Sequence, residues 1–226
     1  RPNCITRKIV FDGIKAIGVE VESGGERFVV EGDEIILSSG AIGSPHLMLL
    51  SGVGPAKHLQ EMGIPVVKDL PGVGQNLRDH PVVFVTWSTK PDHLLDGFAP
   101  RLQTTLRWTA EGSDLRKDLL IFMLSYATDR AYRGVGYIPP LGIRMMASLE
   151  LALSSGELRL TSTDPDQQPS LDYRYFDEEE DLRRMREAVR QCVSLGEHEQ
   201  FNDIIDSRLE PTDEELSSDD NLNTCM

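Results

Sequence analysis

The sequence EIILSSGAIGSPHLMLLSGVGPAKHLQEMGIPVVKDLPGVGQNLRDHP occupies residues 34–81 and decides the fold of the chain. Its first four residues form a short apolar run closed by Ser38-Ser39-Gly40, a pattern typical of a buried strand that meets a turn. Open α/β sheets place their ligands at the carboxyl ends of such strands. Gly40 would allow a ligand close approach to the backbone, although an ordinary strand-to-helix turn has the same pattern.

Two short helices are predicted after this turn. Ser44-Pro45 supplies an N-cap hydroxyl and a proline at the first helical position, so we expect a helix from Ser44 to Leu50. A second helix is expected over residues 55–62, ending at Gly63, where a left-handed conformation costs little. The later glycine turn at residues 72–74 is superficially similar to a dinucleotide-binding fingerprint. Leu77 takes the place of its last glycine and no helix is expected to follow, so we exclude that interpretation.

The flanking sequence predicts further strands and one strong helix. Alternating apolar and polar positions in the second half favour a half-buried antiparallel sheet. Cys192 falls on the apolar stripe of the strong helix and is expected to be a buried small hydrophobe. The expected elements are strands at 5–11, 14–21, 28–30, 82–87 and 119–126, a hairpin of 143–151 with 156–161, a helix at 101–110, and a helix at 177–195 capped by Asp177.

Composition excludes several classes of function. The 226 residues carry a formal net charge of −14, whereas partners such as nucleic acids and anionic membranes require a basic face. No apolar run approaches the roughly 20 residues of a membrane span. The three cysteines are widely separated and show neither metal-ligand spacing nor a disulfide framework. We therefore expect no metal site and a reducing compartment, the cytoplasm.

Three motif blocks carry a resemblance to a known family. They are Gly40-Ala41-Ile42-Gly43-Ser44-Pro45, Leu50-Ser51-Gly52-Val53-Gly54-Pro55 and Pro71-Gly72-Val73-Gly74-Gln75-Asn76-Leu77-Arg78-Asp79-His80-Pro81. In this order and at this spacing, the chain resembles the glucose–methanol–choline (GMC) family of FAD-dependent oxidoreductases, in particular members of the choline and alcohol dehydrogenase type.

The resemblance implies an α/β plus α+β fold with two partial domains. Residues 1–81 would belong to an FAD-binding Rossmann-like domain, and residues 82–226 to a substrate-binding domain with an antiparallel sheet and flanking helices. FAD would be the cofactor and a small-molecule alcohol the substrate. Ser38, Ser39 and Gly40 would contact FAD, and the backbone of Thr6 would contact its adenine, unless Thr6 is simply an edge-strand threonine.

The resemblance also implies where the chemistry lies. In the family, a histidine removes the proton of the substrate hydroxyl while the flavin accepts hydride, because hydride leaves readily from an alkoxide-like carbon. None of the five histidines stands in that context, so we assign no catalytic residue and expect the base outside this chain. Asp79-His80 is either an acid–base pair or, as we favour, a structural clasp at the domain boundary. The chain begins without methionine and is interpreted as an internal fragment that is inactive alone.

Two other functions stay open at this point. The first is a hydroxynitrile lyase of the same fold, which binds FAD without using it for redox chemistry. The second is a non-catalytic interaction module, or one half of a split enzyme. Trp87, Trp108, Tyr132 and Tyr137 are candidates to line a substrate site.

Overall fold

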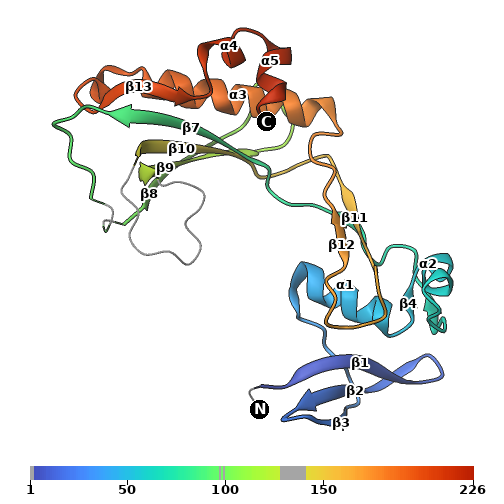
Figure 1. Cartoon of the computed structure of the whole chain (residues 1–226). Helices are drawn as coiled ribbons and strands as arrows, with labels where there is room; N and C mark the ends of the chain where they lie inside the picture. The colour runs from blue at the N-terminus through green and yellow to red at the C-terminus, as the bar shows by residue number, and fades with distance from the viewer. Residues whose placement is uncertain (1–2, 97, 99, 128–140) are drawn as a thin grey trace. The chain divides into compact units, whose positions relative to one another are not determined.

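The computed structural model describes residues 3–96, 98, 100–127 and 141–226 (Figure 1). Contacts divide the chain into two compact units. Unit 1 comprises Arg1–Arg78 and Ser155–Tyr175, and unit 2 comprises Asp79–Ser154 and Phe176–Met226. The sequence-based division at residue 81 differs from this one mainly because residues 155–175 pack with unit 1. The assignment of the units to a flavin domain and a substrate domain stays a prediction.

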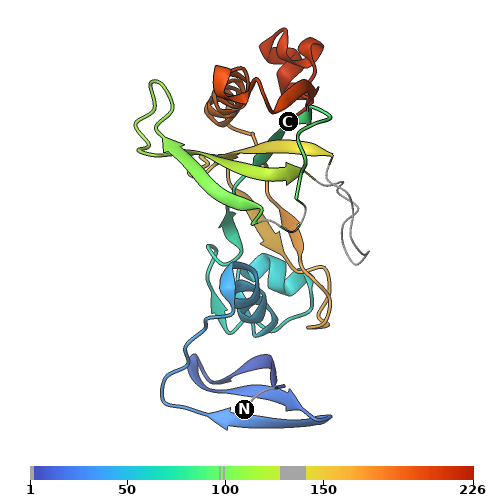
Figure 2. The same cartoon turned by 90° about the vertical axis from the view of Figure 1, so that its left-hand side faces the viewer.

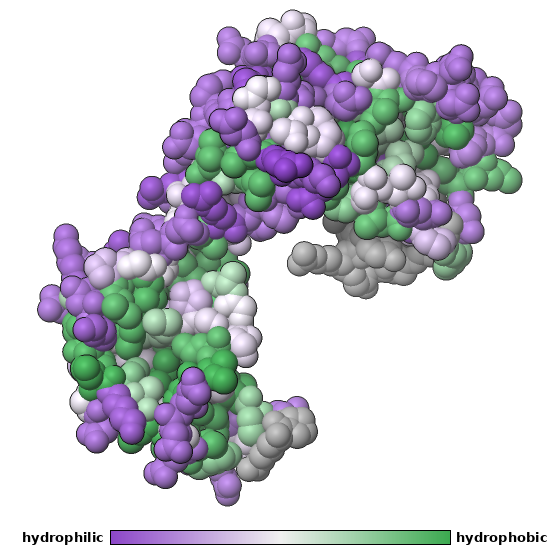
Figure 3. Space-filling view, turned by 180° about the vertical axis from the view of Figure 1, so that it is seen from behind, coloured by the Kyte–Doolittle hydropathy of each residue, from purple (hydrophilic) through white to green (hydrophobic). Residues whose placement is uncertain are grey.

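Unit 1 begins with an antiparallel meander. Its strands are β1 (Ile5–Asp12), β2 (Lys15–Ser23) and β3 (Glu26–Glu31), which pair in sequence order as expected. The β1–β2 turn contains Gly13 with a φ of +60°, a conformation that glycine adopts without steric cost. Several apolar residues of this unit are exposed, and Figure 3 shows apolar surface interspersed with polar patches.

The residues after the meander differ from the prediction at two points. Residues 34–38 form no strand, and Ile36 is 80% exposed, because no described strand lies beside them to satisfy their backbone hydrogen bonds. Helix α1 (Gly40–Leu50) begins four residues earlier than expected, with Ser39 as its N-cap residue. Ser44 is not the cap: its Oγ accepts a hydrogen bond from the Ser39 backbone N–H at 3.0 Å.

The second half of residues 34–81 is largely as predicted. Helix α2 (Ala56–Glu61) is followed by Gly63, which has a φ of +70°. The short strands β4 (Val53–Gly54) and β5 (Lys68–Asp69) pair in parallel on either side of this helix.

A three-stranded sheet completes unit 1. It consists of β6 (Gln75–Leu77), β11 (Gly156–Arg159) and β12 (Ser170–Asp172), with β11 in the centre. Buried Leu49, Leu59, Leu158 and Leu160 form a core between this sheet and the two helices. The predicted hairpin of residues 143–151 with 156–161 is wrong, because the two strands belong to different sheets and pair with distant partners.

His58 fastens α2 to the segment of β11. Its buried ring accepts a hydrogen bond from the Leu160 backbone N–H at Nε2 (3.0 Å), and Nδ1 lies 3.2 Å from the guanidinium of Arg159. Burial, followed by the charge of Arg159, lowers the pKa of His58, and these effects outweigh the opposing carboxylates of Glu61 and Glu157. The fold therefore requires the neutral imidazole.

This requirement predicts an acid-sensitive unit 1. A histidine whose pKa is lowered by folding contributes stability that is fully present above its ordinary value of about 6.5. As the pH falls from that value towards the lowered pKa, the unfolded chain takes up the proton first, so stability decreases. We expect hydrogen exchange at the Leu160 amide to accelerate in this window, after correction for the intrinsic pH dependence. The variant His58→Gln should not show this acceleration of exchange. The same acceleration in the variant would show that another group causes it.

Unit 2 is built on a five-stranded antiparallel sheet with the order β13-β7-β10-β9-β8. Helix α3 (Glu179–Gly196) covers one face of it (Figures 1 and 2). The strands are β7 (Val82–Thr89), β8 (Leu102–Trp108), β9 (Leu119–Ala127), β10 (Gly142–Leu149) and β13 (Ile205–Glu210).

The antiparallel sheet and its flanking helix confirm the predicted fold class. Two predicted details of unit 2 were wrong. Most of the segment 101–110 forms edge strand β8 (Leu102–Trp108) rather than a helix, and the N-cap residue of α3 is Glu178 rather than Asp177. Cys192 is fully buried as expected, and burial raises the pKa of its thiol to about 12. The chain continues through the short helices η1 (Glu199–Phe201), α4 (Asp213–Leu216) and α5 (Asp219–Thr224). Thr212 and Glu215 form a capping box at the start of α4.

A buried charge cluster holds α3 to its surroundings; we call Asp118, Asp181 and Arg184 the Arg184 cluster. The Arg184 side chain is fully buried, contacts Asp181 and lies 2.8 Å from Asp118. Asp118 accepts hydrogen bonds from the loop between β8 and β9, and Asp181 accepts the Leu153 and Ser154 amides at 3.0 and 2.7 Å. Three segments distant in sequence thus meet at one guanidinium.

Candidate functional site

Ser38, Ser39 and Gly40 form an exposed segment at the N-terminus of α1. Gly40 has a φ of +81°, and a Cβ built there would meet no atom within 4 Å. The Ser39 side chain makes no capping bond, and the first turn holds no acidic residue. The first N–H groups of an α-helix lack intrahelical partners and attract anions, so this end of α1 suits a phosphate or a ribose hydroxyl.

A groove of about 380 Å³ runs beside the same helix within unit 1. One wall is formed by residues 41–48 of α1, including Ala41, Ser44 and Met48, and the other by the glycine turn and the residues that follow it, 72–78. The first and third motif blocks therefore meet in space, which the sequence analysis did not foresee. The groove has the size of part of a cofactor site rather than of a complete dinucleotide site.

Backbone strain shapes the groove. Gly74 has a φ of +83°, and a Cβ at this position would lie 2.4 Å from the Leu158 carbonyl oxygen. Asn76, which the sequence analysis missed, has a φ of +61°, an uncommon conformation that often occurs at functional sites. The only available signal was that asparagine adopts this conformation more readily than other non-glycine residues. Strand β6 follows the turn instead of a helix, in agreement with our rejection of the dinucleotide fingerprint.

These observations test whether the chain fits part of an FAD. An accessible helix N-terminus, an open positive-φ glycine and a largely apolar groove on the same helix suit a nucleotide with a planar ring, so the residues fit. Thr6 is exposed on β1, where it pairs with Val21. Among the described residues, no hydrogen bond joins Thr6 to residues 38–40.

The structure places His46, His80 and His198 in different surroundings. His46 lies on α1, its Nε2 is buried without a partner among the described residues, and burial lowers its pKa. His198 accepts a hydrogen bond from the Gln200 backbone N–H. His80 is 55% exposed and lies 3.6 Å from Glu150, while Asp79 accepts the His80 backbone N–H at 2.8 Å. Asp79 and His80 lie in an irregular segment of unit 2 just before β7.

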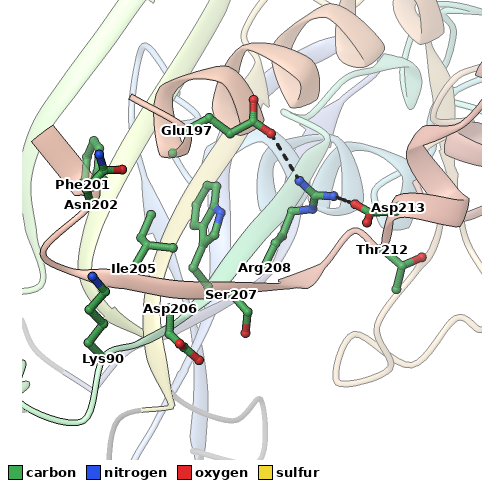
Figure 4. A pocket seen from close by; sticks show the side chains of 12 residues that line it. Lys90, Glu197, Phe201, Asn202, Ile205, Asp206, Ser207, Arg208, Thr212 and Asp213 are labelled. Atoms are coloured by element: carbon green, nitrogen blue, oxygen red, sulfur yellow. Dashed lines mark hydrogen bonds and ion pairs between the residues drawn. The ribbon is translucent and has the colours of Figure 1, made fainter. Parts of the chain in front are cut away.

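The aromatic residues proposed to line a substrate site do not lie together in the structure. Trp108 donates its indole N–H to Glu187 at 3.2 Å, whereas Trp87 is buried beside a second cavity, in unit 2 (Figure 4). Tyr132 and Tyr137 lie outside the described residues. Within the described ranges, no group of acidic, histidine or cysteine side chains could hold a metal ion, and no helix is long and apolar enough to cross a membrane.

Comparison with protein families gives two matches along the chain. The N-terminal model of a family described as GMC oxidoreductase matches residues 1–82, and the C-terminal model of the same family matches residues 152–225. Together they include both motif blocks of the groove and the whole of α3.

Individual relatives agree with these matches. The chain is 32% identical over 251 residues to an oxygen-dependent choline dehydrogenase of Sinorhizobium medicae, an alignment that covers 96% of this chain and 45% of that protein. The chain therefore spans about half the length of the curated relatives it matches.

Solved structures show the same fold at lower identity. A variant of the formate oxidase of Aspergillus oryzae, studied for the effect of its mutation on FAD modification, has a TM-score of 0.80 at 24% identity; the alignment covers 98% of this chain and 48% of that chain. An FAD-dependent oxidoreductase of Chaetomium thermophilum has a TM-score of 0.80 at 21% identity. That alignment covers 99% of this chain and 49% of the other.

Proposed function

The chain belongs to the GMC oxidoreductase family, whose members are FAD-dependent flavoproteins, and from this premise we propose that it is part of an enzyme that oxidises the CH–OH group of a small alcohol. One observation carries the proposal: the open glycine turn at Ser38–Gly40 and the groove of the third motif block share helix α1. The substrate class follows from the choline dehydrogenase relatives.

The proposed roles of this chain are binding and positioning. FAD supplies the hydride acceptor when it is bound. Gly40 lets the nucleotide approach the backbone, the N–H groups at the start of α1 and the hydroxyls of Ser38 and Ser39 hold its polar groups, and Thr6 would contribute a backbone contact. The apolar groove beside α1 excludes water from the part of the cofactor that it covers. We assign no catalytic base to this chain.

The setting of the complete protein is also a proposal. A −14 charge argues against nucleic acid as a partner. The unpaired cysteines favour the reducing environment of the cytoplasm.

The proposed reaction predicts flavin reduction by alcohol. In the complete protein under anaerobic conditions, addition of choline or another small alcohol should bleach the visible absorbance of the bound flavin, because hydride is transferred to it. Stopped-flow absorbance measures the rate, and an alcohol deuterated at the reacting carbon should slow the bleaching. A flavin that stays oxidised while the protein releases cyanide from a hydroxynitrile would instead establish the lyase reaction.

A further inference from the structure

The first strand of unit 1 contains an irregularity that the proposed function does not account for. In β1, Thr6 pairs with Val21 and Lys8 pairs with Glu20, so Arg7 is one extra residue without its own partner on β2. Such a β-bulge bends its strand, and bulges are frequent beside active sites, where they redirect neighbouring groups. Thr6, the residue proposed to contact FAD through its backbone, is therefore adjacent to a bulge.

Strand β1 is also an edge strand of the meander (Figure 1). An edge strand has a row of backbone N–H and C=O groups that face away from the sheet and can bond to other partners. One of these groups, the Ile9 N–H, donates to Ser51 Oγ at the end of α1, at 2.9 Å. Thr6 lies nearer the start of the strand and is exposed. A ligand that bonds to the backbone there depends on where the bulge directs it.

The side chain of Arg7 is buried in the unit. It is only 8% exposed, and its guanidinium bonds to two carboxylates from different elements. Nε donates to Glu22 on β2 at 3.2 Å, and Nη1 donates to Asp166, in the turn between β11 and β12. Because a buried cation is costly without its anions, these charge-assisted bonds hold Arg7, and with it the bulge, in one position.

Both carboxylates are held in place by further bonds. Glu22 also accepts a hydrogen bond from Arg27 on β3 at 3.0 Å, and the bonds from Arg27 and Arg7 lower the pKa of Glu22, so it stays charged near neutral pH. The Asp166 backbone N–H donates to Asp164 Oδ1 at 3.0 Å within the turn. The start of β1 is thus tied through Arg7 to β2 and to the turn between β11 and β12.

We propose that Arg7 is a positioning residue for FAD, which holds the bulge that directs the Thr6 backbone towards the adenine. This inference rests on the proposed function, because it requires that FAD reaches β1. Arg7 itself would not touch the cofactor, since its guanidinium is buried and bonded to two carboxylates. Its loss should therefore weaken binding of the adenine end of FAD and leave binding of the flavin end unaffected.

Two fragments of the cofactor separate these ends. ADP contains the adenine and FMN contains the flavin, and isothermal titration calorimetry measures the Kd of each for the apo form of the complete protein. Arg7→Met should raise the Kd of ADP about tenfold and change the Kd of FMN less than about twofold. A merely structural role of Arg7 would weaken the binding of both fragments.

Arg27→Met is the matched control for this variant. Arg27 also bonds to Glu22, but it is 60% exposed and lies on β3, so both Kd values should stay unchanged. Asp166→Ala removes the second anchor of Arg7 at a side chain that is 66% exposed, and it should also raise the Kd of ADP. This second variant answers the question if Arg7→Met does not fold.

The proposal is overturned if ADP binds to the wild type, to Arg7→Met and to Asp166→Ala with equal affinity. It is also overturned if the variants weaken ADP and FMN to the same extent. Failure of the proposed function is seen separately, in the wild type alone: a complete protein that binds neither FAD nor ADP would overturn both the function and the role of Arg7.

Discussion

Replacing Arg184 with methionine is expected to lower the free energy of unfolding of unit 2 by about 3–5 kcal/mol, because it leaves two carboxylates buried without their cation. Asp118 and Asp181 are both fully enclosed, so water cannot replace the lost guanidinium. Burial alone would raise the pKa of each carboxyl, but Arg184 and the surrounding N–H and hydroxyl donors hold both pKa values below the ordinary range. The native structure therefore depends on both aspartates being charged.

Urea unfolding monitored by tryptophan fluorescence measures this effect, since both tryptophans, Trp87 and Trp108, lie in unit 2. The matched control is Arg183→Met on the next residue of α3, where a half-exposed arginine pairs with Glu180 and Glu187. Loss of this surface network should cost no more than about 1 kcal/mol. Equal losses in the two variants would contradict the role of the Arg184 cluster.

The second large effect concerns the proposed cofactor contact. In the complete protein, Gly40→Val should weaken FAD binding at least about tenfold, because a β-branched residue is strained at a φ of +81° and its side chain would occupy the space in front of α1. Fluorescence of FAD released on dilution measures the affinity.

Gly63→Val is the matched control for this variant. Gly63 also has a positive φ, of +70°, also has no atom within 4 Å of a built Cβ, and lies after α2 in the same unit. The backbone strain is therefore similar, whereas no FAD contact is proposed there. If both variants lose FAD equally, the effect of Gly40→Val is one of stability and not of contact.

Local signals in the sequence predicted much of the secondary structure. The apolar stripe of α3 and the glycine after α2 were sufficient to predict these two helices, because each signal depends on neighbouring residues alone. The prediction of a strand at the start of residues 34–81 was wrong because a strand needs pairing partners, and no local sequence pattern supplies them. The apolar residues Leu102 and Leu106 are four positions apart, as on a helix face, but they lie on the exposed edge strand β8.

The candidate site was predictable only in part. Gly40 stands out in sequence because glycine before a helix permits a positive φ. The groove depends on the packing of α1 against the turn at residues 72–78, and the Trp87 cavity depends on Gly196 lying opposite a distant strand. Such pairs are brought together by the tertiary fold, so spacing along the chain does not reveal them.

The most direct test of the central claim is an experimental structure of the complete protein with FAD. The account predicts that the backbone of Ser38–Gly40 and the groove beside α1 lie within van der Waals or hydrogen-bond distance of the cofactor. An FAD bound without contact to residues 34–81 would contradict it.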